Sequence, residues 1–346
     1  MAKGWMSAAF VLLLASCGGA PATSPGASPS GAGAAQASAS AATPARLKLI
    51  YSANTIDQMP AFAAQDAGYF KKNGLEVDME YLAGGTKTIQ AMLAGQAQVS
   101  LQGGNEAMSA VAGGAELVLI GGLLPVYAFK LEAQKGINSV DDLKGKKLGV
   151  STIGGTADVA LRTFLRKHGI DPDKDLSIIA TGDSQTTSAA IKAGAVDASL
   201  SVPPNLLQAE AAGTHPIADL AGEHLPNAQY SVTVQRGWLS ANRATAQKLT
   251  DSLTEGLARI KKDKPFTEDL MRKYLKYDDQ KGLDYTYDFF TSEVWPDYPH
   301  IKAEQLGDGV TELSKTNEKL KGFNPSSMID DSLVQDAEKR DVAKQA

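Results

Sequence analysis

The chain has 346 residues, with 34 Lys and Arg against 39 Asp and Glu, so its formal net charge at pH 7 is -5. This mild negative charge argues against nucleic acid as a partner, because proteins that bind nucleic acid concentrate positive charge. The chain contains one cysteine, which excludes a disulfide within the chain.

The first sixteen residues have the pattern of a bacterial export signal. Lys3 supplies the charged start, an apolar run extends from Ala8 to Ala15, and Leu14-Ala15-Ser16 stands directly before Cys17. The run is shorter than the roughly 20 residues that a membrane-spanning helix needs. We therefore expect a signal peptide over residues 1–16. An ordinary secretory signal followed by an incidental cysteine is the alternative.

The cysteine position resembles the lipobox of bacterial lipoproteins. That resemblance implies cleavage before Cys17 and a diacylglyceryl group on its thiol, so that the exported protein is anchored in the cell envelope, in the periplasm or on the outer face of the plasma membrane. Residues 18–43 contain almost only Ala, Gly, Ser, Pro and Thr. Such a composition buries too little apolar surface to fold. We expect a flexible tether over residues 17–45.

An internal repeat organises the remainder of the chain. The segments 91–101 (AMLAGQAQVSL) and 190–200 (AIKAGAVDASL) match without gaps at Ala, Ala, Gly, Ser and Leu. Each predicts the last turn of a helix, a glycine that closes it and a short buried strand. Upstream, 69–75 (YFKKNGL) parallels 164–170 (FLRKHGI), where a helix again ends at a glycine. The sequence therefore predicts one βαβ plan used twice.

Two such α/β units predict two lobes, each with a mostly parallel sheet flanked by helices. We expect residues 46–124 and 230–346 to form lobe 1 and residues 125–229 to form lobe 2. Residues 124–129 and the extended segment 229–234 are then two crossover hinge strands, and helices follow at 242–260 and 267–277. Two hinge strands permit the lobes to close around a ligand.

Ligands of such sheets bind at the carboxyl ends of the strands. The loops expected there are rich in Gly, Ser, Thr and Asn, and they cover residues 52–54, 84–86, 102–105, 151–156 and 201–205. Small residues let a ligand approach the main chain, and helix N-termini attract negative charge. The alternative is that residues such as Thr86 and Thr156 only cap helices.

Aromatic residues leave the ligand class open. Tyr51, Tyr127, Phe129, Tyr230 and Trp238 fall at strand ends or in the expected crossovers, where a flat ligand could stack on them. They could equally pack the core or the hinge. The expected ligand is therefore a small organic acid, oxoanion or sulfonate, or else a pyrimidine-type ring compound.

Three segments carry a resemblance to a known family: 64–77 (AQDAGYFKKNGLEV), 94–99 (AGQAQV) and 139–150 (SVDDLKGKKLGV). They resemble the substrate-binding proteins of the nitrate, taurine and alkanesulfonate family, which includes binders of thiamine-pyrimidine precursors. This implies a two-lobed α/β fold of the periplasmic-binding-protein type (type II). The family usually has an acidic residue after the helix-closing glycine. This chain has Gln98 at that position of the first repeat and an acidic residue, Asp197, at the equivalent position of the second.

The resemblance also implies a function and a set of ligand contacts. A monomer would bind a small-molecule solute and pass it to an ABC permease in the membrane. A ligand-sensing or adhesive lipoprotein without a transporter is the alternative. Thr152 joins the candidates because it lies in the same loop as two of them. The candidate ligand-binding residues are Ser52, Asn54, Gly85, Thr86, Gly104, Asn105, Thr152, Gly155, Thr156, Pro204 and Asn205.

Enzyme and metal functions find little support in the sequence. The four histidines are His168, His215, His224 and His300, and neither an HExxH nor a GxSxG motif occurs. The loop 152–156 (TIGGT) lacks the lysine of a nucleotide-phosphate loop. We expect no catalytic residues, no cofactor and no metal site.

Overall fold

The computed structural model describes residues 43–346. The expected signal peptide, Cys17 and nearly all of the expected tether lie outside the described residues, so these three expectations stay predictions. The first strand, β1, begins at Ala45.

The first sheet has five strands in the order β2-β1-β3-β10-β4. Strands β2, β1 and β3 are parallel, while β10 runs antiparallel to both β3 and β4. Strand β4 lies at the edge of the sheet, yet its apolar run Leu117–Ile120 is buried. The strands are β1 Ala45–Tyr51, β2 Leu75–Tyr81, β3 Val99–Gln102, β4 Leu117–Val126 and β10 Pro226–Gln235.

The second sheet has the order β7-β6-β8-β5-β9. Strands β7, β6 and β8 are parallel, and β5 runs antiparallel to both β8 and β9. The strands are β5 Lys130–Ala133, β6 Lys147–Val150, β7 Ser177–Ala180, β8 Ala198–Ser201 and β9 His215–Asp219. Both sheets are therefore mixed, with one strand of each running against the others.

The two sheets repeat one topology, which confirms the repeat predicted from the sequence. Strands β2, β1 and β3 correspond in order and direction to β7, β6 and β8. Gly95 closes helix α3 before β3, and Gly194 closes helix α6 before β8. Their φ values are 78° and 69°, a left-handed conformation that glycine adopts without steric cost. Gly74 and Gly169 form a second such pair, with φ of 73° and 77°.

The substitution at Gln98 keeps the hydrogen bond that the repeat uses. In the second sheet, the Lys147 backbone N–H donates to Asp197 Oδ2 at 2.7 Å. In the first sheet, the Lys48 backbone N–H donates to Gln98 Oε1 at 2.9 Å. An amide oxygen accepts this bond as a carboxylate does, so the fold tolerates the change.

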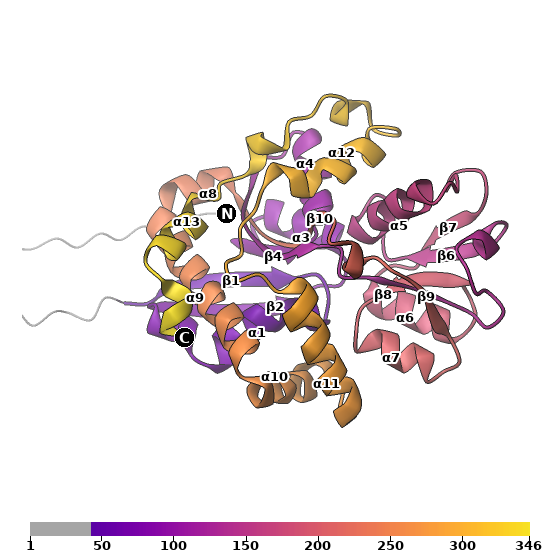
Figure 1. Ribbon diagram of the computed structural model, residues 1–346. Helices are drawn as coiled ribbons and strands as arrows, with labels where there is room; N and C mark the ends of the chain where they lie inside the picture. The colour runs from indigo at the N-terminus through magenta and orange to yellow at the C-terminus, as the bar shows by residue number, and fades with distance from the viewer. Residues whose placement is uncertain (1–42) are drawn as a thin grey trace, which may run out of the picture. The chain divides into compact units, whose positions relative to one another are not determined.

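We call the first sheet with its helices lobe 1 and the second sheet with its helices lobe 2. Figure 1 shows helices α1 and α9 beside the first sheet and helices α5, α6 and α7 around the second. The chain passes from β4 to β5 through residues 127–129 and returns from β9 to β10 through residues 220–225. The two passages touch, since the Leu220 N–H donates to the Phe129 carbonyl at 3.0 Å. These two adjacent connections form the hinge; the first overlaps the expected crossover 124–129, whereas the expected return segment 229–234 lies within β10, after the chain has already returned.

The helices of lobe 1 come from both ends of the described chain. Helices α8 to α13 follow β10, and α9 packs against α1. The helices are α1 Met59–Asp66, α2 Tyr69–Lys72, α3 Gly85–Leu93, α4 Gly104–Ala112, α8 Arg236–Ala241, α9 Arg243–Lys262, α10 Lys264–Leu270, α11 Gln280–Phe289, α12 Gly307–Leu313 and α13 Ser332–Lys339. Lobe 2 has α5 Thr156–Lys167, α6 Ser184–Lys192 and α7 Asn205–Glu210.

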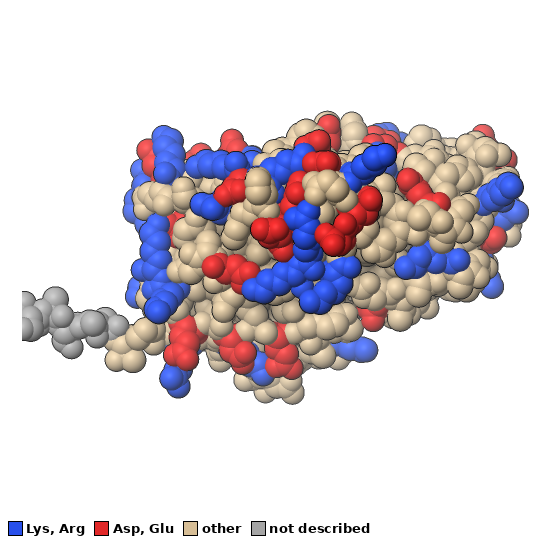
Figure 2. Space-filling view, turned by 90° about the horizontal axis from the view of Figure 1, so that it is seen from below, with Lys and Arg blue, Asp and Glu red and all other residues tan. Residues whose placement is uncertain are grey.

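The C-terminal segment packs on lobe 1. The Arg340 guanidinium donates to both oxygens of Asp251 in α9, at 2.6 and 2.9 Å. Ile329 forms an isolated bridge with Leu119 of β4. On the face shown in Figure 2, Lys and Arg are interspersed with Asp and Glu. Within residues 43–346, no helix combines the length and apolarity that crossing a membrane would require.

Candidate functional site

A cavity of about 90 Å³ lies between the two lobes. The volume is well below the roughly 300 Å³ at which pockets for drug-sized ligands begin, so it suits a small ligand. Its walls come from the carboxyl ends of β1, β3, β6 and β8 and from the hinge. Its lining includes Ser52, Thr55, Asp57, Gly85, Gly103, Glu106, Phe129, Ser151, Thr156, Asp183, Ser184, Thr187, Ser188, Ser201, Asn205, Gln229 and Tyr230.

Four of the candidate residues line this cavity, two from each lobe. Ser52 follows β1, and Gly85 begins α3. Thr156 begins α5, and Asn205 begins α7. Two of the five aromatic candidates, Phe129 and Tyr230, also line it. The loops after the strands therefore do meet in one place, from both sides of the cleft.

The other seven candidates do not line the cavity. Asn54 donates from Nδ2 to the Tyr274 carbonyl at 3.1 Å, and Thr86 is exposed. A side chain at Gly104 would face Ala228 and Leu306. The remaining four also lie outside the lining: Asn105, which is fully buried against α12, Thr152, Gly155 and Pro204.

Glu106 joins the two lobes inside the cavity. It belongs to the first turn of α4 in lobe 1, and its carboxylate lies at the N-terminus of α5 in lobe 2. The Thr156 hydroxyl donates to Glu106 Oε2 at 2.9 Å, and the Thr156 backbone N–H donates to Oε1 at 3.3 Å. Burial raises the pKa of Glu106, and these two bonds partly oppose the shift. A carboxylate here is also stabilised by the helix dipole, by about 0.3–1 kcal/mol.

Asp57 is the most deeply buried carboxylate of the cavity, at 9% exposure. It lies in a short helical turn, Ile56–Gln58, directly after β1. The Thr55 hydroxyl donates to Asp57 Oδ2 at 3.0 Å, whereas Oδ1 has no hydrogen-bond partner. Burial raises the pKa of Asp57 from 3.8 to about 6, and the Thr55 bond opposes that shift. An unpaired buried oxygen is costly unless a ligand or water satisfies it.

Gln229 and Tyr230 supply polar groups from β10. The Ala128 backbone N–H donates to Gln229 Oε1 at 2.6 Å, so the other end of this amide, Nε2, is a donor, and it has no partner. The Tyr230 hydroxyl donates to the Leu101 carbonyl at 2.9 Å and accepts from the Ser52 backbone N–H at 3.2 Å. The lining therefore combines a free acceptor, Asp57, with a free donor, Gln229.

The sequence signal for the two carboxylates was present but weak. Glu106 stands directly after the candidate Asn105, and Asp57 stands three residues after the candidate Asn54. Each is an acidic residue in the first turn of a helix that follows a strand of the first sheet. That pattern also occurs wherever an acid merely favours a helix N-terminus, so it does not identify a cavity residue.

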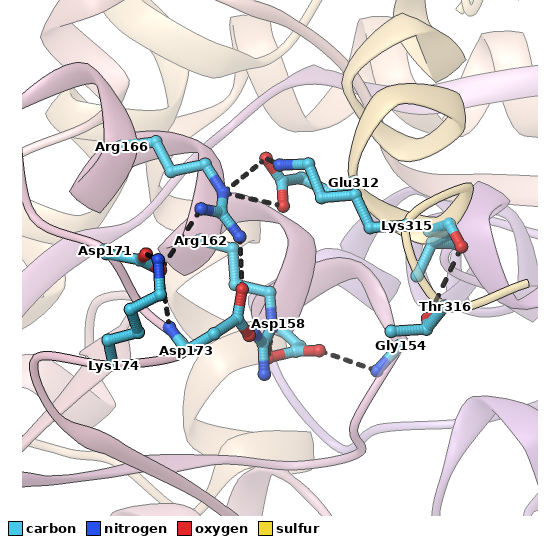
Figure 3. Close-up of polar contacts among 11 residues, drawn as sticks. Gly154, Asp158, Arg162, Arg166, Asp171, Asp173, Lys174, Glu312, Lys315 and Thr316 are labelled. Carbon is cyan, nitrogen blue, oxygen red and sulfur yellow. Dashed lines mark hydrogen bonds and ion pairs between the residues drawn. The ribbon is translucent and has the colours of Figure 1, made fainter.

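The lobes also meet outside the cavity. Arg166 of α5 donates from Nε to both oxygens of Glu312 in α12, each at 3.1 Å (Figure 3). Glu312 also pairs with Lys315 at 2.6 Å. Tyr127 donates to Asp308 of the same segment at 3.2 Å. Helix α12 therefore extends from lobe 1 to contact lobe 2, and the structure is a conformation in which the lobes touch.

No cationic side chain lines the cavity within the described part of the chain. Its ionisable groups are Asp57, Glu106, Asp183 and Tyr230. Residues 43–346 contain no group of three or more His, Cys, Asp or Glu positioned to hold a metal ion. The chemistry available at this site is hydrogen bonding from small polar groups, negative charge and one aromatic wall.

Among curated proteins, the chain is similar to the binding protein YtlA of Bacillus subtilis (strain 168). The two are 26% identical over 213 residues, which cover 60% of this chain and 64% of YtlA. The chain thus matches less than two thirds of the length of this relative.

Solved structures share the fold over most of the chain. The alkanesulfonate-binding protein SsuA of Xanthomonas axonopodis pv. citri, bound to MOPS, has a TM-score of 0.69 at 18% identity and covers 84% of this chain and 100% of its own. A ligand-binding component of an ABC-type import system from Staphylococcus aureus has a TM-score of 0.67 at 15% identity, with coverages of 85% and 99%. The desulfurization enzyme DSZB has a TM-score of 0.61 at 16% identity, with coverages of 85% and 99%.

These structures establish the two-lobed fold of binding proteins, which confirms the fold class expected from the sequence. The model of the family described as NMT1/THI5 like matches residues 55–264, more than half of the chain. That range contains β2 to β10, both hinge passages and every residue of the cavity lining except Ser52 and Ala53. The chain therefore belongs to the NMT1/THI5-like family.

Proposed function

We propose that this protein is an extracytoplasmic solute-binding protein that delivers a small molecule to an ABC importer. One observation carries the proposal: a small polar cavity lies between two similar lobes, at a hinge made of two adjacent chain passages. Such a hinge lets the lobes close on a solute and open to release it, which is what a carrier needs. The names of similar proteins, among them SsuA and a component of an ABC-type import system, support it.

We favour binding over catalysis, although one protein of this fold is an enzyme. Nucleophilic catalysis needs a nucleophile within reach of a base. Serine and threonine hydroxyls line the cavity, but within residues 43–346 no histidine, lysine or cysteine lines it with them. Both buried carboxylates accept hydrogen bonds from threonine hydroxyls, Glu106 from Thr156 and Asp57, through one oxygen, from Thr55. This arrangement holds a ligand and offers no evident bond-breaking step.

The proposal predicts a small molecule bound one to one per chain. Native mass spectrometry of the purified protein is expected to show a mass increment that disappears when the protein is unfolded, and sedimentation is expected to show a monomer. Collision-induced release then gives the mass of the solute. If no increment appears, and a library of small metabolites leaves the melting temperature unchanged, the solute-binding function is wrong.

The lipid anchor is part of the proposal and has its own test. If Cys17 carries the lipid, Cys17→Ala is expected to move the protein from the membrane fraction to the soluble envelope fraction. Solute binding should persist, because the cavity is formed by residues 52–230. Immunoblots of separated fractions, with the wild type beside the variant, measure this. A variant that stays with the membrane contradicts anchoring through Cys17.

A further inference from the structure

The charge of the cavity differs from what an anion carrier would need. Three carboxylates line it, from Asp57, Glu106 and Asp183, and no Lys, Arg or His does so within residues 43–346. An anionic ligand would face these carboxylates in a partly dehydrated site, where like charges repel strongly.

The helix N-termini that could attract an anion already face carboxylates of the protein. Glu106 accepts from the backbone N–H and hydroxyl of Thr156 at the start of α5. It also lies beside the start of α3, since a Cβ added at Gly85 would be 3.0 Å from its Cγ. Asp183 caps α6, accepting from the Thr186 N–H at 2.8 Å. The positive ends of these helices are thus neutralised before any ligand arrives.

The unsatisfied groups of the cavity indicate what a ligand must offer. Asp57 lines the cavity, and its buried Oδ1 accepts no hydrogen bond. Gln229, at 4% exposure, lines the same cavity with Nε2 unpaired. A ligand that donates to Asp57 and accepts from Gln229 satisfies both, and Phe129 adds an apolar wall.

We propose that the cavity selects a small cation, a protonated amine or amidinium group, with Asp57 as its counter-ion. This inference rests on the proposed solute-binding function. The cation donates hydrogen bonds to the buried carboxylate, as water would do at the surface, and its positive charge pairs with the negative charge of Asp57. Glu106 keeps its place at α5 and closes the lobes beside the ligand. Within the expected range of ligands, this favours a nitrogen compound over an oxoanion, a sulfonate or an organic acid.

The test compares probes that match in size and differ in charge. Benzamidinium is paired with benzoate and butylammonium with butyrate, and each is titrated calorimetrically into the purified chain at pH 7.5. We expect each cation to bind at least tenfold more tightly than its matched anion. In Asp57→Asn this preference should be lost while the fold persists, because the change removes a buried charge. Glu318→Gln, an exposed carboxylate paired with Lys321, is the charge-matched control and should keep the preference.

Acidification gives a second readout of the same carboxylate. The ionisable groups facing the cavity besides Asp57 are Glu106 from α4, Asp183 from the β7–α6 turn and Tyr230 from β10. Since the pKa of Asp57 is about 6 without a ligand, lowering the pH from 7.5 to 5 protonates it. Benzamidinium stays charged over this range, so its affinity should fall at least tenfold in the wild type and less in Asp57→Asn.

The outcomes separate the ligand class from the function. Anions that bind as tightly as their matched cations, or cation binding that Asp57→Asn leaves unchanged, overturn the cation proposal and leave solute binding intact. If no probe of either charge binds at millimolar concentration and no solute co-purifies, both proposals fail.

Discussion

Gly103→Val will hold the lobes apart and weaken solute binding at least about 100-fold, or about 2.7 kcal/mol. Gly103 belongs to lobe 1, where it precedes α4. A Cβ at this position would overlap Thr156 Oγ1 and Glu106 Oε2, and it would come within 2.9 Å of Thr156 Cβ in lobe 2. The backbone itself accepts valine, because its φ is -64° and its ψ is 144°. The strain is therefore relieved by opening the cleft.

Small-angle X-ray scattering and calorimetry measure this effect together. The variant is expected to have a larger radius of gyration than the wild type, weaker binding of the co-purified solute and nearly the same melting temperature in the empty state. Gly237→Val is the control, since a Cβ there meets nothing within 4 Å. Wild-type affinity together with an unchanged radius of gyration would show that binding does not need the observed lobe contact.

Gly256→Ala will destabilise the whole fold, by about 2 kcal/mol. Gly256 lies in α9 where that helix crosses α1. An added Cβ would overlap the Pro60 carbonyl oxygen and lie 3.0 Å from the Ala64 nitrogen, both backbone atoms of α1 that no rotamer change can move. Separating two packed helices costs about 1–3 kcal/mol or more, which exceeds the gain of about 1 kcal/mol from replacing glycine in a helix.

Urea denaturation measures this loss as a lower midpoint with an unchanged slope. Gly237→Ala makes the same substitution in helix α8, where space is open, and should be neutral or slightly stabilising. Equal midpoints for Gly256→Ala and the wild type would mean that α1 and α9 can separate without cost, contrary to the buried contact between them.

Local patterns were enough to predict the elements and their repetition. A strand, a helix and a closing glycine each leave a signature within a few residues, as in the segments that end at Gly95 and Gly194. The helix predicted at 242–260 is α9, Arg243–Lys262. The first expected crossover, 124–129, overlaps the hinge, whereas the second, 229–234, lies within β10, because its alternating apolar residues belong to a buried strand of the first sheet.

Which residues line the cavity depends on how each helix is rotated about its own axis. Consecutive residues of a helix point about 100° apart. Asn105 therefore faces α12 while its neighbour Glu106 faces the cavity, although both follow the same strand. The start of α4 is held where Gly104 lies against Ala228 and Leu306, residues more than a hundred positions away, and Asn105 then lies against Gly309 of α12.

The sequence by itself determined the α/β order, the internal repeat and the edge of each sheet where a ligand would bind, since these follow from periodicity and from glycine conformation within short segments. Only the tertiary structure decided the charge of the cleft. The loops are rich in glycine, serine and threonine, which suggested bare amides for an anion. The fold then placed Glu106 of one lobe on the helix N-terminus of the other and buried Asp57 in the same cavity, and such electrostatics depend on distances between segments that are far apart in the chain.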